Sequence, residues 1–215
     1  DLDLSHGTTI SSDFYPDEHT HITQNRIPRG YTFMKWYGGP LVNDGNPLRR
    51  SLKTICKLFT DPTLFKYWFA RNWHKRVVLL TVMQNLDNRI SISFGRHIRN
   101  LFLSRGLYTK RWRGKEAPTN LPVANEAVRI LAEEMGGTPS NPLMESLLNQ
   151  GTTAHILGGC HMGRSAEDGV ISTSHEVFNH PGLYIVDGAA VSANVGVNPS
   201  LTITALAERA MSLIP

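Results

Sequence analysis

The apolar residues of this chain recur at helical spacing in several separate stretches. In residues 47–60 they lie three or four positions apart, directly after Asn46-Pro47, a helix cap followed by a first-turn proline. Asp61-Pro62 repeats the same signal before a stretch rich in leucine, phenylalanine and tryptophan. The pattern therefore predicts two consecutive helices that begin at these prolines.

Three more helices are predicted downstream. Residues 121–135 carry apolar positions at helical spacing and are followed by a glycine pair, which is typical of a helix end. Residues 143–148 form a short helix, and a last helix begins at Asn198-Pro199 and runs to about Ile214.

Residues 8–27 are predicted to form two short strands with a turn at residues 15–18, where proline and acidic residues gather. His19 and His21 alternate with polar neighbours, so we expect both imidazoles on one exposed face of the second strand.

Residues 77–83 and 89–94 fit the two arms of a β-hairpin, with the first arm apolar on both faces and therefore central. Residues 106–112, 170–171 and 183–187 are predicted as further short strands. Strands and helices do not alternate regularly. We therefore expect an α+β fold, with a mostly antiparallel sheet and helices packed on it.

The composition changes this picture little. The chain has 215 residues, 40% hydrophobic and 19% charged, and a net charge of +4, as in ordinary globular proteins. The basic cluster at residues 110–115 is predicted to be solvated surface, so no nucleic-acid partner is expected. No stretch has the ~20 apolar residues of a membrane span. Cys56 and Cys160 are expected to be reduced and separately buried. The chain starts with Asp1, which suggests part of a longer protein.

Two polar residues stand where the oxidation of an alcohol would need them. His155 precedes the glycines Gly158-Gly159, and a histidine with an ordinary pKa of ~6.5 can accept a hydroxyl proton. Asn198 lies at the start of the last helix, where its amide could hold the substrate oxygen and where backbone N–H groups favour anionic charge. The hydride acceptor must be a cofactor. Taken singly, each residue also fits a purely structural role, His155 in a loop and Asn198 as a helix cap.

Three motifs follow one another in the last third of the chain: H-x-x-G-x-C-x-M, a strand ending in D-G, and V-G-V-N-P before an alanine-rich helix. Their order resembles the C-terminal end of glucose–methanol–choline (GMC) flavoprotein oxidoreductases, in particular the cholesterol-oxidase-like branch. The resemblance implies FAD as cofactor and a catalytic role for His155 and Asn198. It also implies that Asp187 and Gly188 touch the ribityl-phosphate region of the flavin. The residues expected to border its ring are Asn198, Pro199, Leu201 and Thr202.

The resemblance further implies a domain division and a reaction. Residues 1–170 would form the substrate-binding domain, and residues 171–215 the C-terminal strand and helix of an FAD-binding domain. The family's G-x-G-x-x-G fingerprint has no counterpart here, so the N-terminal FAD-binding half of the same protein is an expected partner. The expected reaction is hydride transfer from the CH–OH group of an apolar alcohol to flavin, with a sterol as the first candidate.

Other function classes are weaker hypotheses. A GMC-like fragment or binding module without catalysis remains an alternative. A serine hydrolase is disfavoured because no G-x-S-x-G motif occurs. A metal-binding domain would have to use ligands whose spacing matches no known structural zinc site, so no metal is expected. Those ligands would be Cys160, His161, His175 and His180 or, separately, His19 and His21.

Overall fold

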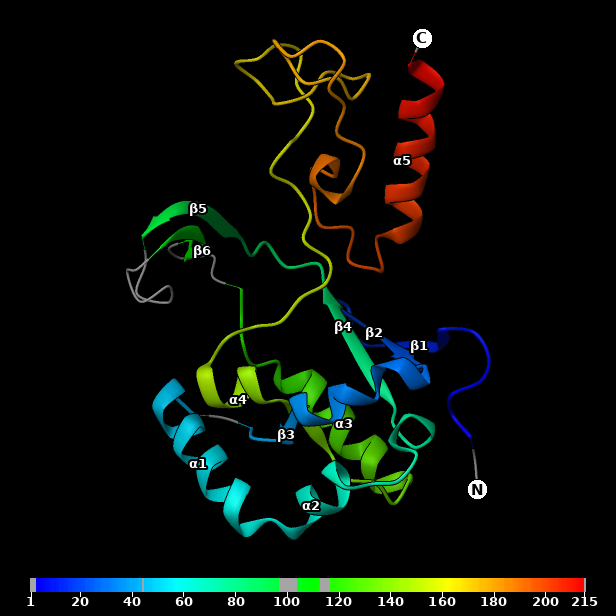
Figure 1. Cartoon of the computed structure of the whole chain (residues 1–215), viewed down its shortest axis with the longest axis vertical. Helices are drawn as coiled ribbons and strands as arrows, with labels where there is room; N and C mark the ends of the chain where they lie inside the picture. The colour runs from blue at the N-terminus through cyan, green and yellow to red at the C-terminus, as the bar shows by residue number, and fades with distance from the viewer. Residues whose placement is uncertain (1–2, 44, 97–103, 113–116, 215) are drawn as a thin grey trace. The chain divides into compact units, whose positions relative to one another are not determined.

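The computed structural model describes residues 3–43, 45–96, 104–112 and 117–214, so part of the predicted basic cluster at residues 110–115 lies outside them. The fold is α+β, as predicted (Figure 1). The helices are α1 (Pro47–Thr60), α2 (Pro62–Trp68), α3 (Pro122–Glu134), α4 (Leu143–Leu148) and α5 (Ser200–Leu213), with 3-10 turns η1 (Arg29–Tyr37), η2 (Trp73–Lys75) and η4 (Gly188–Ala190). The strands are β1 (Ile10–Asp17), β2 (Thr20–Asn25), β3 (Gly38–Pro40), β4 (Leu79–Gln84), β5 (Ile90–Arg96), β6 (Arg105–Arg111) and β7 (Ser140–Pro142).

The predicted helices are confirmed, and capping side chains set the starts of the first two, α1 and α2. The Asn46 side chain accepts a hydrogen bond from the Arg49 backbone N–H at 2.9 Å and begins α1. Asp61 does the same for α2 by accepting from the Thr63 N–H at 2.9 Å. Each cap satisfies a backbone donor that the first helical turn leaves without a partner.

The predicted hairpin between residues 77–83 and 89–94 is wrong. β4 is the end strand of a sheet with the order β1-β2-β4, so it is not central, whereas β5 pairs antiparallel with β6. The β5–β6 register places Ile90 opposite Arg111 and Phe94 opposite Leu107. Alternating side chains identify a strand but do not specify its partner, and the sequence therefore did not reveal this pairing.

The first two strands were predicted, but their turn lies further along the chain. β1 continues through Pro16 to Asp17, so the turn falls at Glu18 and His19. As a turn residue, His19 does not follow the alternation of β2. Its side chain is 53% exposed, whereas His21 is buried at 7% exposure, so the expected shared exposed face is wrong.

The chain divides into two compact units. Unit 1 comprises residues 1–16, 22–82 and 87–152, and unit 2 comprises residues 17–21, 83–86 and 153–215. Each unit has its own buried hydrophobic side chains. They are Ile22, Ile27, Val42, Leu64, Trp73 and Ala124 in unit 1, and Met83, Ile171, Ala190, Val191 and Ala210 in unit 2.

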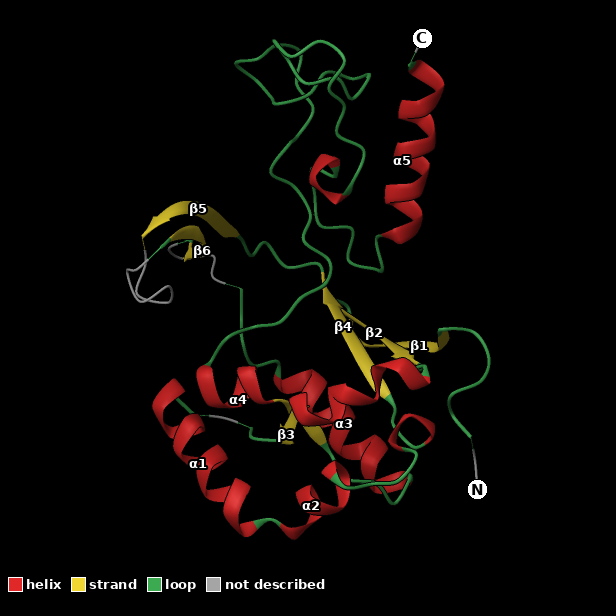
Figure 2. Ribbon diagram, in the orientation of Figure 1, coloured by secondary structure: helices red, strands yellow, loops and turns green. Residues whose placement is uncertain are grey.

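Unit 2 is mostly irregular before α5 (Figure 2). The strands predicted at residues 170–171 and 183–187 are only isolated bridges, which join Ile171 to Met162 and Val177, and Tyr184 to Glu176. An extended segment becomes a regular strand only when a neighbouring segment continues the ladder, and these bridges are not extended in that way.

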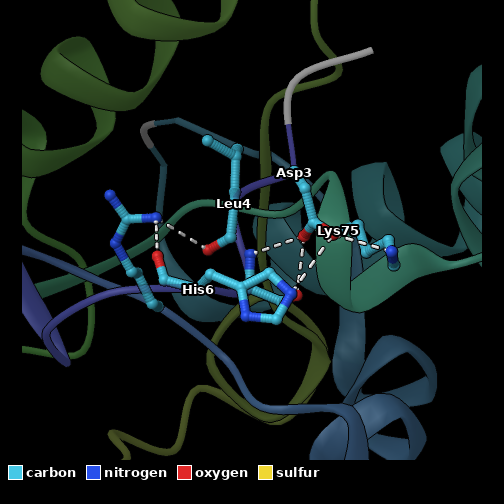
Figure 3. Close-up of polar contacts among 6 residues, drawn as sticks. Asp3, Leu4, His6 and Lys75 are labelled. Atoms are coloured by element: carbon cyan, nitrogen blue, oxygen red, sulfur yellow. Dashed lines mark hydrogen bonds and ion pairs between the residues drawn. The ribbon is translucent and has the colours of Figure 1, made fainter.

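The first residues of unit 1 are held by charged contacts with η2 and with Arg26 (Figure 3). The carboxylate of Asp3 lies 2.7 Å from Nζ of Lys75. The hydrogen bond from Lys75, followed by those from Ser5, holds the pKa of Asp3 well below its usual range. The Arg26 guanidinium donates to the carbonyl oxygens of Leu4, at 3.3 Å, and of His6.

Candidate functional site

The segment that follows His155 is shaped by two glycines. Gly158 and Gly159 have φ values of +78° and +104°, a region that side-chain-bearing residues avoid. The Gly158 N–H donates to the carbonyl of Gly188 at 3.0 Å, and the Cys160 N–H donates to the carbonyl of Ala189 at 3.0 Å. The glycine turn therefore lies against η4, which the D-G motif forms.

Gly188 is the point where three segments of unit 2 meet. A methyl group at Gly188 would lie 3.0 Å from the carbonyl oxygen of Ile156, 3.4 Å from Leu157 Cδ2 and 3.5 Å from Ile203 Cδ1. Ile156 follows His155 directly, and Ile203 belongs to the first turn of α5, after Asn198. The backbone segments that carry the two predicted catalytic residues thus pack on the same glycine.

Asn198 is a helix-capping residue with one half of its amide engaged. Its Oδ1 accepts hydrogen bonds from the Ser200 N–H at 3.2 Å and from the Ser200 hydroxyl at 2.8 Å. Within the described residues, Nδ2 makes no hydrogen bond, so this group is available as a donor. Asn198 is half-buried, Pro199 is buried, and the following Leu201 is 81% exposed. A capping role and a substrate-holding role are therefore compatible in this side chain.

His155 is half-buried and keeps both ring nitrogens available. Its backbone N–H donates to Oγ1 of Thr153 at 3.1 Å. In the part of the chain that the structure describes, no hydrogen bond reaches the imidazole and none joins it to Asn198. The side chains of His155 and Asn198 thus each have a polar group that could bind a ligand.

Asp187 has a local structural contact. Its Oδ1 accepts from the Ala189 N–H at 2.9 Å and caps η4, while the carboxylate is exposed. Thr202, the last of the predicted flavin neighbours, is half-buried in the first turn of α5.

Sequence reasoning missed the residues that support the V-G-V-N-P turn. Gly196 has a φ of +70°, and a methyl group on it would lie 3.0 Å from Cβ of Asn85. Oδ1 of Asn85 accepts a hydrogen bond from Nδ1 of His19 at 2.9 Å, and the backbone N–H of Asn85 donates to the His19 carbonyl at 3.1 Å. Asn194 donates to the carbonyl of Gln84. The only sign of this close approach in the sequence was Gly196, the glycine of the V-G-V-N-P motif.

The metal hypothesis finds no cluster to support it. Among the described residues, no group of at least three His, Cys, Asp or Glu side chains is placed to hold a metal ion. Cys56 and Cys160 are free thiols, and Cys56 is exposed, contrary to the expectation that both are buried. Its position on an outward face of α1 explains this. A surface hollow of about 310 Å³ in unit 2 is lined by none of the predicted site residues, but by Met162, Gly163, Arg164, Asp168 and Thr173.

Comparison with known proteins identifies the family. The C-terminal family model of GMC oxidoreductases matches residues 103–207. A cholesterol oxidase of Mycobacterium tuberculosis (strain ATCC 25618 / H37Rv) is 39% identical over 229 residues, covering 100% of this chain and 37% of that protein. The chain belongs to the GMC oxidoreductase family. A cholesterol oxidase of Acinetobacter baumannii is 37% identical over 100% of the chain and 38% of its own length.

The predicted family is thereby confirmed. A 2-methyl-1,2-propanediol dehydrogenase of Mycolicibacterium austroafricanum is 34% identical over 50% of the chain. This GMC oxidoreductase chain spans under two-fifths of the length of the cholesterol oxidases that it matches. Every predicted site residue, from His155 to Thr202, lies within the matched residues 103–207.

Proposed function

We propose that this chain is part of an FAD-dependent oxidoreductase that acts on the CH–OH group of an apolar alcohol, with a sterol as the first candidate. The observation that carries the proposal is the packing at Gly188 of the segment after His155 and the first turn of α5. The similarity to cholesterol oxidases over the whole chain supports the choice of substrate.

The residues present fit a flavin. At Gly159, φ is +104° and no atom lies within 4 Å of the position a side chain would take, so a flat ligand could approach the backbone closely. The N-terminus of α5 provides the positive end of a 14-residue helix, which favours an anionic group. When bound, the flavin supplies the hydride acceptor. The contacts that we assign to it come from Asp187, Gly188, Asn198, Pro199, Leu201 and Thr202.

The two polar side chains divide the remaining work. His155 accepts the hydroxyl proton through a ring nitrogen that has no hydrogen bond within the described residues. Asn198 donates from Nδ2 to the alcohol oxygen, while its Oδ1 stays on Ser200 and fixes the plane of the amide. An amide donor can stabilise negative charge on that oxygen without competing for the proton.

We further propose the domain division expected from the resemblance. Residues 1–170 form the substrate-binding domain, and residues 171–215 belong to the FAD-binding domain. The cholesterol oxidases extend well beyond the aligned region, which leaves room for the rest of an FAD-binding domain.

Substitutions in the complete protein test these roles by single-turnover flavin reduction. His155→Ala should slow reduction by roughly 10²-fold, the usual scale of a general base. His161→Ala is the matched control, because this exposed histidine lies in the same segment with its Nε2 2.9 Å from the Asp168 carbonyl. The control should leave the rate unchanged.

Asn198→Asp separates the two roles of the asparagine. The carboxylate keeps an acceptor for Ser200 and therefore preserves the cap, but it removes the Nδ2 donor. We expect the Asn198→Asp variant to fold and to bind flavin normally. Flavin reduction in this variant should nevertheless be slower by roughly 10²-fold. An unchanged rate in Asn198→Asp and His155→Ala would refute both roles. A complete protein that binds no flavin and oxidises neither sterols nor simple alcohols would favour the non-catalytic alternative.

A further inference from the structure

The outward face of α1 is apolar. Leu48, Leu52, Ile55 and Phe59 recur three or four positions apart, so they form one stripe along the helix. They are 69%, 58%, 44% and 83% exposed, respectively. Large apolar side chains so exposed and so regularly spaced are typical of an interaction surface rather than of scattered surface residues.

The inward face of the same helix is polar, which is the reverse of an ordinary surface helix. Arg50 is 2% exposed and Thr54 is fully buried. The Arg50 guanidinium donates to Oδ1 of Asn149 at 2.8 Å and to the Glu145 carbonyl at 3.1 Å, and burial lowers the pKa of Arg50. The fold of unit 1 thus uses the polar side of α1 and leaves its apolar side outward.

α1 leads directly into α2 (Figure 1), and neighbouring elements of unit 1 also expose large apolar side chains. Phe65 of α2 is 51% exposed, Phe69 directly after α2 is 68% exposed, and Trp36 of η1 is 52% exposed. The rings of Trp36 and Phe69 meet edge to face at 5.7 Å. We call the stripe of α1 together with these three aromatic residues the α1–α2 apolar face.

The surroundings of this face are basic. Asp61 is the only acidic residue in residues 46–76, and it caps α2. Arg49 and Lys53 are exposed on α1 and have no ion pair among the described residues, and Nζ of Lys35 lies 5.0 Å from the centre of the Trp36 ring. An apolar face bordered by positive charge complements a surface that is apolar inside and anionic outside.

We propose that the α1–α2 apolar face docks on an anionic lipid bilayer, with α1 lying in the plane of the headgroups. Helices with leucine and aromatic residues on one face and lysine and arginine on the other bind membranes in this way. None of the described helices is long and apolar enough to cross a membrane, so α1 would lie on the surface. The inference uses no residue of the proposed catalytic site and stands apart from the proposed function.

Vesicle sedimentation of the complete protein tests the proposal, with phosphatidylcholine alone compared with phosphatidylcholine plus phosphatidylglycerol. Binding should require the anionic lipid and weaken as salt is added. Phe59→Ser should weaken binding by about tenfold, because a large apolar side chain no longer enters the interface. Lys53→Glu should weaken it several-fold, with a reduced salt dependence. Leu52→Ser provides a second apolar variant.

Phe94→Ser is the matched control, since Phe94 is 61% exposed on β5, outside the α1–α2 apolar face. It should bind like the parent protein. The proposal fails if the complete protein binds neither kind of vesicle, which would mean that another part of the protein or another molecule covers the face. It also fails if Phe59→Ser and Phe94→Ser bind alike, or if Phe59→Ser changes only the oligomeric state in light scattering.

Discussion

The close approach of Gly196 to Asn85 gives a sharp prediction, because another glycine of the chain has the same backbone conformation without the contact. Gly196→Ala puts a side chain at a φ of +70°, which costs about 1 kcal/mol on its own. The new methyl group would also lie 3.0 Å from Asn85 Cβ, so one segment must shift by a few tenths of an ångström. Such overpacking adds about 1–2 kcal/mol.

Gly136→Ala is the control for the backbone term alone. Gly136 has a φ of +60°, and no atom lies within 4 Å of the added methyl position. Both variants should lower the apparent Tm of the complete protein, and Gly196→Ala should lower it more. Because Asn198 lies two residues after Gly196, that variant should also slow flavin reduction by about tenfold, whereas Gly136→Ala should leave the rate unchanged.

A second substitution tests the contact between the new methyl group at position 196 and Cβ of Asn85. Asn85→Gly removes the Cβ that the alanine would meet, so adding it to Gly196→Ala should recover about 1 kcal/mol relative to the sum of the single effects. Equal losses of stability in Gly196→Ala and Gly136→Ala, with equal reduction rates, would refute the argument that Asn85 supports the turn before Asn198.

Two further predictions concern unit 1. Arg50→Met should destabilise the protein by about 3 kcal/mol in urea unfolding, because it leaves the Asn149 and Glu145 oxygens without their charged donor; a loss below about 1 kcal/mol would contradict this. Asp3→Asn should lower the Tm at neutral pH, and the difference from the parent should shrink as the pH falls. The pKa of Asp3 is lowered in the folded protein, so its stabilisation is present above the unfolded value of ~3.9 and is lost as pH falls through the folded pKa. A Tm difference that stays constant from neutral to acidic pH would argue against the Asp3–Lys75 contact.

The sequence by itself determined the helices, because their signals are local. Asn46 and Asp61 cap the first turns of α1 and α2 as predicted, and the pattern from His155 to Asn198 identified the family. The roles of His155, Asn198 and the flavin neighbours stay predictions until the substitutions above are made. In the sequence these roles rest on residue chemistry and motif order, which indicate the residues that belong together but not what each side chain contacts.

Only the tertiary structure decided which strands pair and which faces are covered. β4 and β5 are neighbours in sequence but lie in different sheets, and His19 and His21 differ in burial because one lies in a turn. Three further features depend on residues far apart in the chain. They are the packing of segments at Gly188, the contact of Gly196 with Asn85 and the outward apolar side of α1. Hydrophobic periodicity shows that a helix has an apolar and a polar face, but it does not show which face is buried. In α1 the polar face is buried because the oxygen atoms around Arg50 accept its hydrogen bonds.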